Sequence, residues 1–201
     1  MALRLAQLEP QRISAVMALS TALHYDGWGN PWFTPLLPLA RVFAFSQSWR
    51  IAEKSPFGVK DVRMRAWLEK QMQRLGQSAA GAASLRIKDL LQARQLGSMV
   101  LRDLPQLTMP ILLLHAKEDE CASPKSAVEV ASRVRSSTIR FVLLDNCYHM
   151  ISIDLEKERG LQEMKDFLQS LAAPLQTHSV SDFASAFDSS FDAPPQTAAA
   201  P

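Results

Sequence analysis

The feature that most constrains the fold is an alternation of two short apolar runs with two helical patterns between residues 111 and 172. The apolar runs, Ile111–Leu114 and Ile139–Leu144, have the length and composition of buried strands. Between them, Ser123-Pro124 predicts the start of a helix, with Ser123 as its N-cap. One face of this helix carries apolar residues at spacings of three and four, namely Ala127, Val130, Ala131 and Val134.

The second apolar run is followed by another helical pattern. Asp154 is predicted to cap this last helix. Its expected buried stripe consists of Leu161, Met164, Leu168 and Leu171. An order of strand, helix, strand and helix is typical of a parallel sheet covered by helices, so the predicted fold class is α/β.

The first part of the chain adds a third strand and an insertion. Residues 2–9 predict a short helix, which ends at Pro10, and the apolar run Ile13–Leu19 predicts a buried strand. Residues 20–108 hold all four tryptophans of the chain and are broken into short pieces by prolines, and we expect a mostly helical insertion there. From Pro174 onward the chain is rich in Ser, Ala, Pro and Gln, which predicts a disordered tail over residues 174–201.

Composition excludes several classes of protein. The 201 residues are 47% hydrophobic, enough for one domain with a core, and the net charge of +2 gives no footprint for nucleic acid or an anionic membrane. No run approaches the ~18 apolar residues that cross a bilayer, and the first ten residues lack the pattern of a secretory signal. We therefore expect a soluble, cytoplasmic protein in which Cys121 and Cys147 are free thiols.

Two loops that follow the last two predicted strands carry groups suited to acid–base chemistry. Asp119 lies in the first loop and His149 in the second. Because ligands of open α/β sheets bind at the carboxyl ends of the strands, these two side chains are expected to meet there. A carboxylate that fixes the tautomer of an imidazole allows the histidine to act as a general base near neutral pH.

Three segments resemble a known family. Pro110–Asp119 resembles the segment in which an α/β-hydrolase strand ends in His-Gly-x-x-Asp, with Ala116 in place of the glycine. Leu144–Ile151 resembles the Ser-x-His segment of the same family, with Cys147 where serine or glycine is common. Leu19–Trp28 is similar to the segment that enters the lid in bacterial carboxylesterases and monoacylglycerol lipases, which belong to the serine aminopeptidase-like hydrolases.

The resemblance covers residues 1–172 and implies the C-terminal part of an α/β-hydrolase domain over residues 1–173. Three parallel strands would lie side by side, with flanking helices and a helical lid over about residues 27–108. The implied activity is hydrolysis of small-molecule esters with medium or long acyl chains, with Asp119 as triad acid, His149 as base, and no cofactor or metal.

The serine of that triad is the element that the sequence lacks. In the family the N-terminal part carries the oxyanion loop and a serine in a G-x-S-x-G elbow, and no such motif occurs here. Gly76-Gln77-Ser78 is the nearest imitation, but a predicted helix precedes Ser78 where the elbow needs a strand. Met1 corresponds to the start of the helix after the elbow, so we expect a truncated chain whose strand Ile13–Leu19 is an uncovered edge.

Other interpretations of these residues remain open. Asp119 could be an ordinary loop aspartate, and Asp26 is an alternative acid. His24 and His115 are expected to form loop hydrogen bonds rather than to take part in catalysis. The function itself has an alternative from another class, a catalytically inactive remnant that binds an apolar ligand or a partner chain. The expected partner in either case is a second copy at the strand edge or a complementing N-terminal half.

Overall fold

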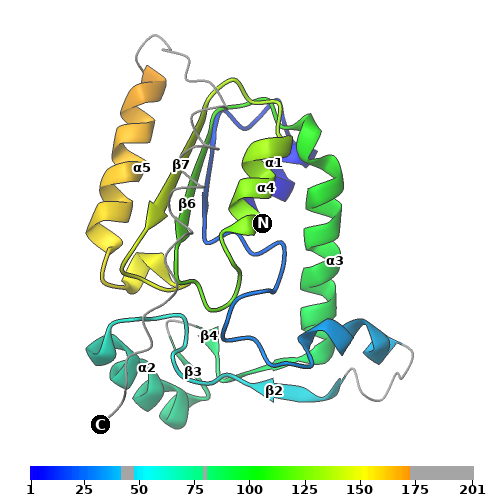
Figure 1. The fold of residues 1–201 in the computed structure, drawn as a ribbon, viewed down its shortest axis with the longest axis vertical. Coiled ribbons are helices and arrows are strands. Elements are labelled where there is room, and N and C mark those ends of the chain that lie inside the picture. Colours follow the sequence, from blue (N-terminus) through cyan, green and yellow to red (C-terminus); the bar gives the residue numbers. More distant parts are fainter. Residues whose placement is uncertain (42–47, 79–80, 173–201) are drawn as a thin grey trace, which may run out of the picture.

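A three-stranded parallel sheet forms the centre of the computed structural model, which describes residues 1–41, 48–78 and 81–172. The strands are β1 (Val16–Leu19), β6 (Ile111–Ala116) and β7 (Ile139–Leu144), in the order β1-β6-β7 (Figure 1). Val16 pairs with Ile111, and Ile111 pairs in turn with Ile139. The predicted α/β class with three parallel strands is confirmed.

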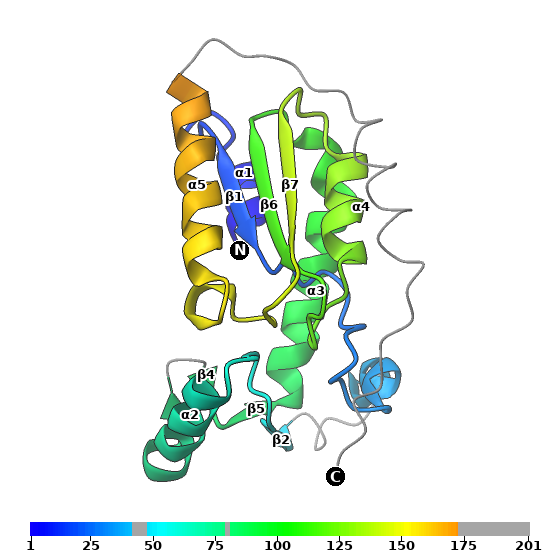
Figure 2. The ribbon, with the colours of Figure 1, turned by 60° about the vertical axis from the view of Figure 1, so that its left-hand side comes forward.

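Helices cover both faces of this sheet, as Figure 2 shows. One face carries α1 (Ala2–Leu8), α4 (Lys125–Arg133) and the second half of α3 (Ile87–Asp103), and the other carries α5 (Lys157–Ala172). Both faces of β6 are therefore buried, because Ile111 and Leu113 pack toward α1, α3 and α4 while Leu112 and Leu114 pack toward α5. Burial on both faces explains why this strand is a continuous apolar run rather than an alternating one.

Strand β1 lies at one edge of the sheet, and β6 is its strand neighbour in the described part of the chain. It is shorter than the predicted run, since it begins at Val16 rather than Ile13. Helix α1 packs against it and buries Leu3 and Ala6. Its other two leucines, Leu5 and Leu8, are 53% and 60% exposed.

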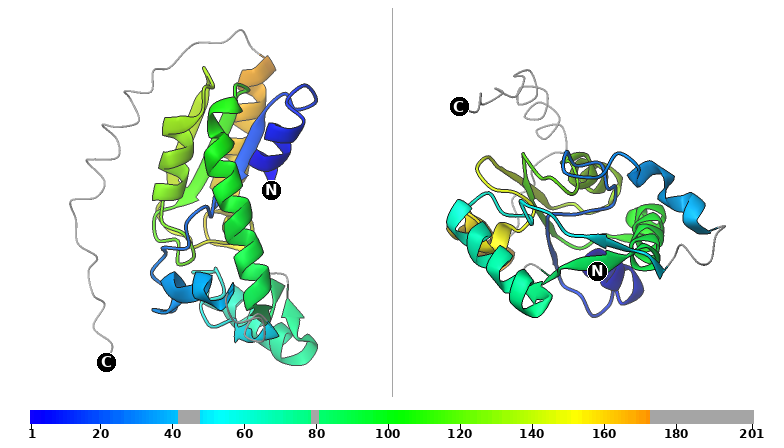
Figure 3. Two further views of the ribbon diagram at one scale, coloured as in Figure 1. Left: turned by 90° about the vertical axis from the view of Figure 1, so that its right-hand side faces the viewer. Right: turned by 90° about the horizontal axis from the view of Figure 1, so that it is seen from below.

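In its described part, the segment between β1 and α3 lies beyond the carboxyl ends of the strands, as Figures 1 and 3 show. It contains helix α2 (Val62–Leu75) and, before α3, a 3-10 helix at Thr34–Arg41. The predicted mostly helical character holds for most of the regular structure here, and this segment also forms two small antiparallel ladders. Their strands are β2 (Arg50–Ala52), β5 (Ser84–Arg86), β3 (Gln77–Ser78) and β4 (Gly81–Ala82).

Two details of the predicted helices are corrected. Ser123 does not cap α4, since Pro124 is the N-cap residue and both the amide and the hydroxyl of Ser123 donate to Asp26. Asp154 lies three residues before α5, and its carboxylate accepts backbone amides that include those of Lys60 and Tyr148.

The buried face of α5 is also rotated from the predicted stripe. Phe167 and Gly160 are its buried residues, with Met164 and Leu171 packed beside them, because the helix turns this side toward the sheet. Leu161 and Leu168, which were predicted to be buried, are 41% and 53% exposed. The predicted tail, residues 174–201, lies outside the described residues. Among the described residues, no helix is long and apolar enough to cross a membrane.

Candidate active site

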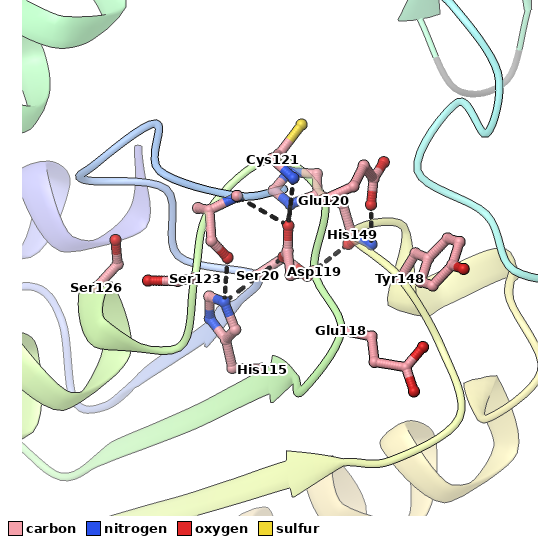
Figure 4. Close-up of polar contacts among 12 residues, drawn as sticks. Ser20, His115, Glu118, Asp119, Glu120, Cys121, Ser123, Ser126, Tyr148 and His149 are labelled. Atoms are coloured by element: carbon pink, nitrogen blue, oxygen red, sulfur yellow. Dashed lines mark hydrogen bonds and ion pairs between the residues drawn. The ribbon is translucent and has the colours of Figure 1, made fainter. Parts of the chain in front are cut away.

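Asp119 lies in the loop that leaves the carboxyl end of β6 and is only 2% exposed. Its Oδ1 accepts hydrogen bonds from the backbone amides of Cys121, at 2.8 Å, and Ala122, at 2.9 Å. A carboxylate that folds back onto the amides of its own loop is held in one orientation. The loop therefore presents the other carboxylate oxygen in a fixed direction (Figure 4).

His149 lies in the loop that leaves the neighbouring strand, β7, and faces this carboxylate. Its Nδ1 is 2.8 Å from Oδ2 and 3.0 Å from Oδ1 of Asp119. With Nδ1 donating its proton to a carboxylate, the neutral imidazole carries its free electron pair on Nε2. The side chain remains 24% exposed, so the ring is accessible from outside the protein. The structure thus brings together the two residues that the sequence singled out.

The electrostatic surroundings of His149 favour its protonated form. Burial alone would disfavour the imidazolium, but the hydrogen bond and charge of Asp119, followed by the charges of Glu120 and Glu53, outweigh it and raise the pKa of His149. Glu120 is itself buried, which raises the pKa of its carboxyl group. Its Oε2 accepts the backbone amide of His149 at 3.2 Å.

A contact from β1 also holds the site in place and was not predicted from the sequence. The hydroxyl of Ser20, at the carboxyl end of β1, donates to the backbone carbonyl of His149. Ser20 has a positive φ of 47°, an uncommon conformation for a residue other than glycine. Each of the three strands therefore contributes a residue from its carboxyl end to this one cluster.

The acid loop is supported from outside by residues 27–30. The amides of Gly27 and Gly29 donate to the carbonyls of Cys121 and Glu120, and the side chain of Asn30 donates to the carbonyl of Cys121 at 2.6 Å. A Cβ atom at Gly27 would lie 2.3 Å from the carbonyl oxygen of Glu120, which is far inside contact distance. The close approach of these two backbones requires glycine at this position.

The other candidate residues lie apart from this pair or in different roles. The carboxylate of Asp26 accepts hydrogen bonds from the amide and the hydroxyl of Ser123. The exposed side chain of His24 is bonded to Glu129 at 2.6 Å. His115 is fully buried in β6, where its Nε2 bonds to the carbonyl of Ala122 at 2.9 Å.

The remaining nucleophile candidates, a serine and two cysteines, are unsuited to nucleophilic attack. Ser78 lies in β3, directly after helix α2 and paired with β4, so the strand–serine–helix order of an elbow is absent there. Cys121 and Cys147 are free thiols, and burial and then neighbouring carboxylates raise the pKa of each to about 12. Thiols with such pKa values are protonated and weakly nucleophilic at neutral pH.

A cavity of about 690 Å³ opens between the insertion and the acid loop. Glu120 and Cys121 lie at its acid-loop end. Apolar side chains of the insertion form much of its wall, among them Phe33, Leu37, Ile51, Phe57 and Leu90. A cavity of this size with apolar walls has the dimensions of a small-molecule binding site. In the described part of the chain, no cluster of His, Cys, Asp and Glu has an arrangement that could hold a metal ion.

The sheet, its covering helices and an Asp–His pair at the carboxyl ends of adjacent strands define an α/β-hydrolase. A family model described as serine aminopeptidase, S33, matches residues 1–156. The chain belongs to this family of hydrolases. A search among curated proteins found no match.

Solved structures share this fold. The chain is similar to a structure of the metagenome-derived lipolytic enzymes LipS and LipT, at 18% identity and a TM-score of 0.65, covering 84% of this chain and 60% of that one. A monoacylglycerol lipase from Paleococcus ferrophilus matches at 18% identity and a TM-score of 0.65, and the match covers 84% of this chain and 63% of that one. A monoglyceride lipase from Saccharomyces cerevisiae matches at 17% identity and a TM-score of 0.67, and the match covers 84% of this chain and 60% of that one. The chain thus spans about three fifths of the length of these structures.

Proposed function

We propose that this chain supplies the acid and the base of a Ser-His-Asp triad that hydrolyses carboxylic esters. The observation that carries the proposal is the bond of 2.8 Å between Asp119 and Nδ1 of His149 at the carboxyl ends of adjacent strands. In this mechanism His149 takes the proton of the attacking serine hydroxyl and later gives it to the leaving alcohol. Asp119 keeps the imidazole in the required tautomer and stabilises the imidazolium.

The attacking serine in this proposal belongs to a polypeptide outside the 201 residues. Two observations support this assignment, namely the absence of G-x-S-x-G from the sequence and the position of Ser78 after a helix. The solved lipases that share the fold are longer than this chain, which leaves room for an elbow in the whole protein. We propose that the elbow-bearing segment docks at the open edge of β1, where no other strand of the described residues pairs with the backbone.

The acyl chain of the substrate is assigned to the cavity beside the acid loop. In this assignment residues 27–108 act as a lid, and the apolar walls formed by Phe33, Leu37 and Leu90 contact the acyl chain. The alcohol part of the ester would face the serine.

The test is hydrolysis of p-nitrophenyl butyrate and octanoate by the purified chain, with and without the polypeptide encoded in frame upstream of Met1. We expect no turnover above buffer for the chain alone and turnover for the mixture. His149→Ala is expected to abolish that turnover, whereas His24→Ala serves as the matched control, because the His24 side chain is exposed and bonds to Glu129, away from the candidate site. Equal turnover in the mixture with and without His149 would refute the proposal.

A second candidate function, binding without catalysis, is supported by the cavity itself. A chain that lacks a nucleophile could still bind an apolar ligand between Phe33, Leu37 and Leu90. Binding of a fatty-acid probe to a mixture that shows no ester turnover would favour this alternative. The edge of β1 gives a third outcome, a dimer of two copies of the chain, which sedimentation would reveal.

A further inference from the structure

The carboxylate of Asp154 accepts four backbone amides, although the sequence predicts this residue as a helix cap. It is 2% exposed. Its Oδ2 accepts the amides of Tyr148, at 2.7 Å, and Lys60, at 2.8 Å. Its Oδ1 accepts the amides of Asp61 and Leu155, each at 2.9 Å. One buried carboxylate thus joins the histidine loop to a segment of the insertion that lies about ninety residues earlier.

The segment Gly58–Asp61 makes further contacts with the same loops. The carbonyl of Gly58 accepts the amide of Met150 at 2.7 Å. The ammonium of Lys60 lies 2.8 Å from Oε2 of Glu118 in the acid loop and 5.6 Å from the centre of the Tyr148 ring. This segment is therefore fastened to both loops of the candidate site.

These bonds hold the two residues that flank His149 in the chain. The amide before it, Tyr148, is held by Asp154, and the amide after it, Met150, is held by Gly58. A Cβ atom at Gly58 would lie 2.5 Å from Cγ of Met150, so the Met150 side chain packs closely on the backbone of Gly58. Movement of the segment away from the loop would break the bond to the Met150 amide and would take from Asp154 two of its four donors, the amides of Lys60 and Asp61.

We propose that Asp154 is a positioning residue for His149, and that it couples the segment Gly58–Asp61 to the histidine loop so that the two move as one unit. This inference rests on the proposed function, since it assigns a purpose to the position of His149. A displacement of the insertion that admits a substrate would then also displace the base, and closure would restore the bond between His149 and Asp119. The carboxylate is suited to this task because its two oxygens accept four amides, which would otherwise lose these partners in a partly buried place.

The test uses Asp154→Asn in the 201-residue chain. Asparagine keeps one oxygen for two of the amides and places an NH₂ group against the other two. We expect the Met150 amide to exchange at least ~10-fold faster, since local opening becomes easier. The pKa of His149, followed by NMR, should fall toward its ordinary value, because a displaced imidazole loses its contact with Asp119. Asp61→Ala is the matched control, because its carboxylate caps α2 through Arg63 and Met64 and does not touch the histidine loop.

A purely structural role for Asp154 would lower the melting temperature without changing the titration of His149. An unchanged His149 titration and unchanged Met150 exchange in a folded Asp154→Asn variant would overturn the proposal. If that variant does not fold, amide hydrogen exchange in the unsubstituted chain tests the coupling instead. The amides of Lys60, Tyr148 and Met150 should then open together, with equal protection after correction for intrinsic rates. Opening of Lys60 at least ~10-fold more often than Tyr148 and Met150 would overturn the proposal.

None of these readouts requires ester hydrolysis. A failure of the proposed function would leave the exchange and titration results unaffected, and a failure of the coupling would leave the ester assay unaffected.

Discussion

Replacing Asp119 tests how the acid loop and the histidine depend on one buried carboxylate. Asp119→Ala removes the acceptor of three donors, namely the amides of Cys121 and Ala122 and Nδ1 of His149. Breaking a buried charged pair of this kind costs about 3–5 kcal/mol. For a chain of this size each kcal/mol lowers the melting temperature by roughly 2–4 °C, so we expect a decrease of about 10 °C.

Asp119→Asn separates the structural part of this effect from the electrostatic part. The amide oxygen can still accept the amides of Cys121 and Ala122, so the loss of stability should be only about 1–2 kcal/mol. The NH₂ group, however, faces Nδ1 of His149 and must donate to it, which moves the imidazole proton to Nε2. Burial is then no longer outweighed by a negative charge at this position, so the pKa of His149 should fall.

Urea unfolding gives the free energies of both variants, and ¹⁵N shifts of the imidazole report the tautomer and the titration. The reasoning would be refuted by an Asp119→Ala variant that loses less than about 1 kcal/mol, well below the cost of breaking a buried pair. An Asp119→Asn variant in which His149 keeps both its titration and its tautomer would also refute it.

Three further predictions concern pH, packing and thiol reactivity. Because the pKa of His149 is raised, the contribution of this residue to the free energy of unfolding is complete below about pH 6.5 and is lost as the pH rises through the raised pKa. Urea midpoints should therefore decrease between pH 6 and 8. In the His149→Gln variant this pH dependence should be weaker. Gly27→Ala should cost about 1–3 kcal/mol in the same assay because its Cβ would meet the backbone of Glu120, and an unchanged midpoint would contradict that packing. With pKa values of about 12, Cys121 and Cys147 should react with a disulfide reagent at pH 8 about a thousandfold more slowly in the folded chain than in urea, so prompt labelling of the native protein would be contrary to expectation.

The sheet and the central pair could be predicted from the sequence because they depend on local patterns. Burial on both faces makes β6 a compact apolar run, and β7 is largely apolar although mostly half-buried, so both stand out from the polar loops that follow them. Parallel strands end at the same edge of a sheet, so the loops after them had to bring Asp119 and His149 close together. The observed separation of 2.8 Å between Nδ1 of His149 and Oδ2 of Asp119 agrees with this expectation.

The remaining features could not be predicted because they depend on contacts between distant segments. Asp154 was interpreted as a helix cap, whereas its partners Lys60 and Tyr148 are brought to it by the tertiary fold. The ladder between β2 and β5 pairs three residues with three others more than thirty positions away, too few to produce an alternating pattern. The buried side of α5 is set by its packing on the sheet, which selects Phe167 rather than Leu168.

The most direct test of the central claim is labelling with a fluorophosphonate, a reagent that reacts with activated serines. The chain would be mixed with the polypeptide encoded in frame upstream of Met1, and the site of labelling determined by mass spectrometry. We expect a label on a serine of the upstream polypeptide, formed only when the chain is present and lost with His149→Ala. A label that forms without His149, or that lies on a residue of this chain, would contradict the claim that Asp119 and His149 activate a serine from outside it.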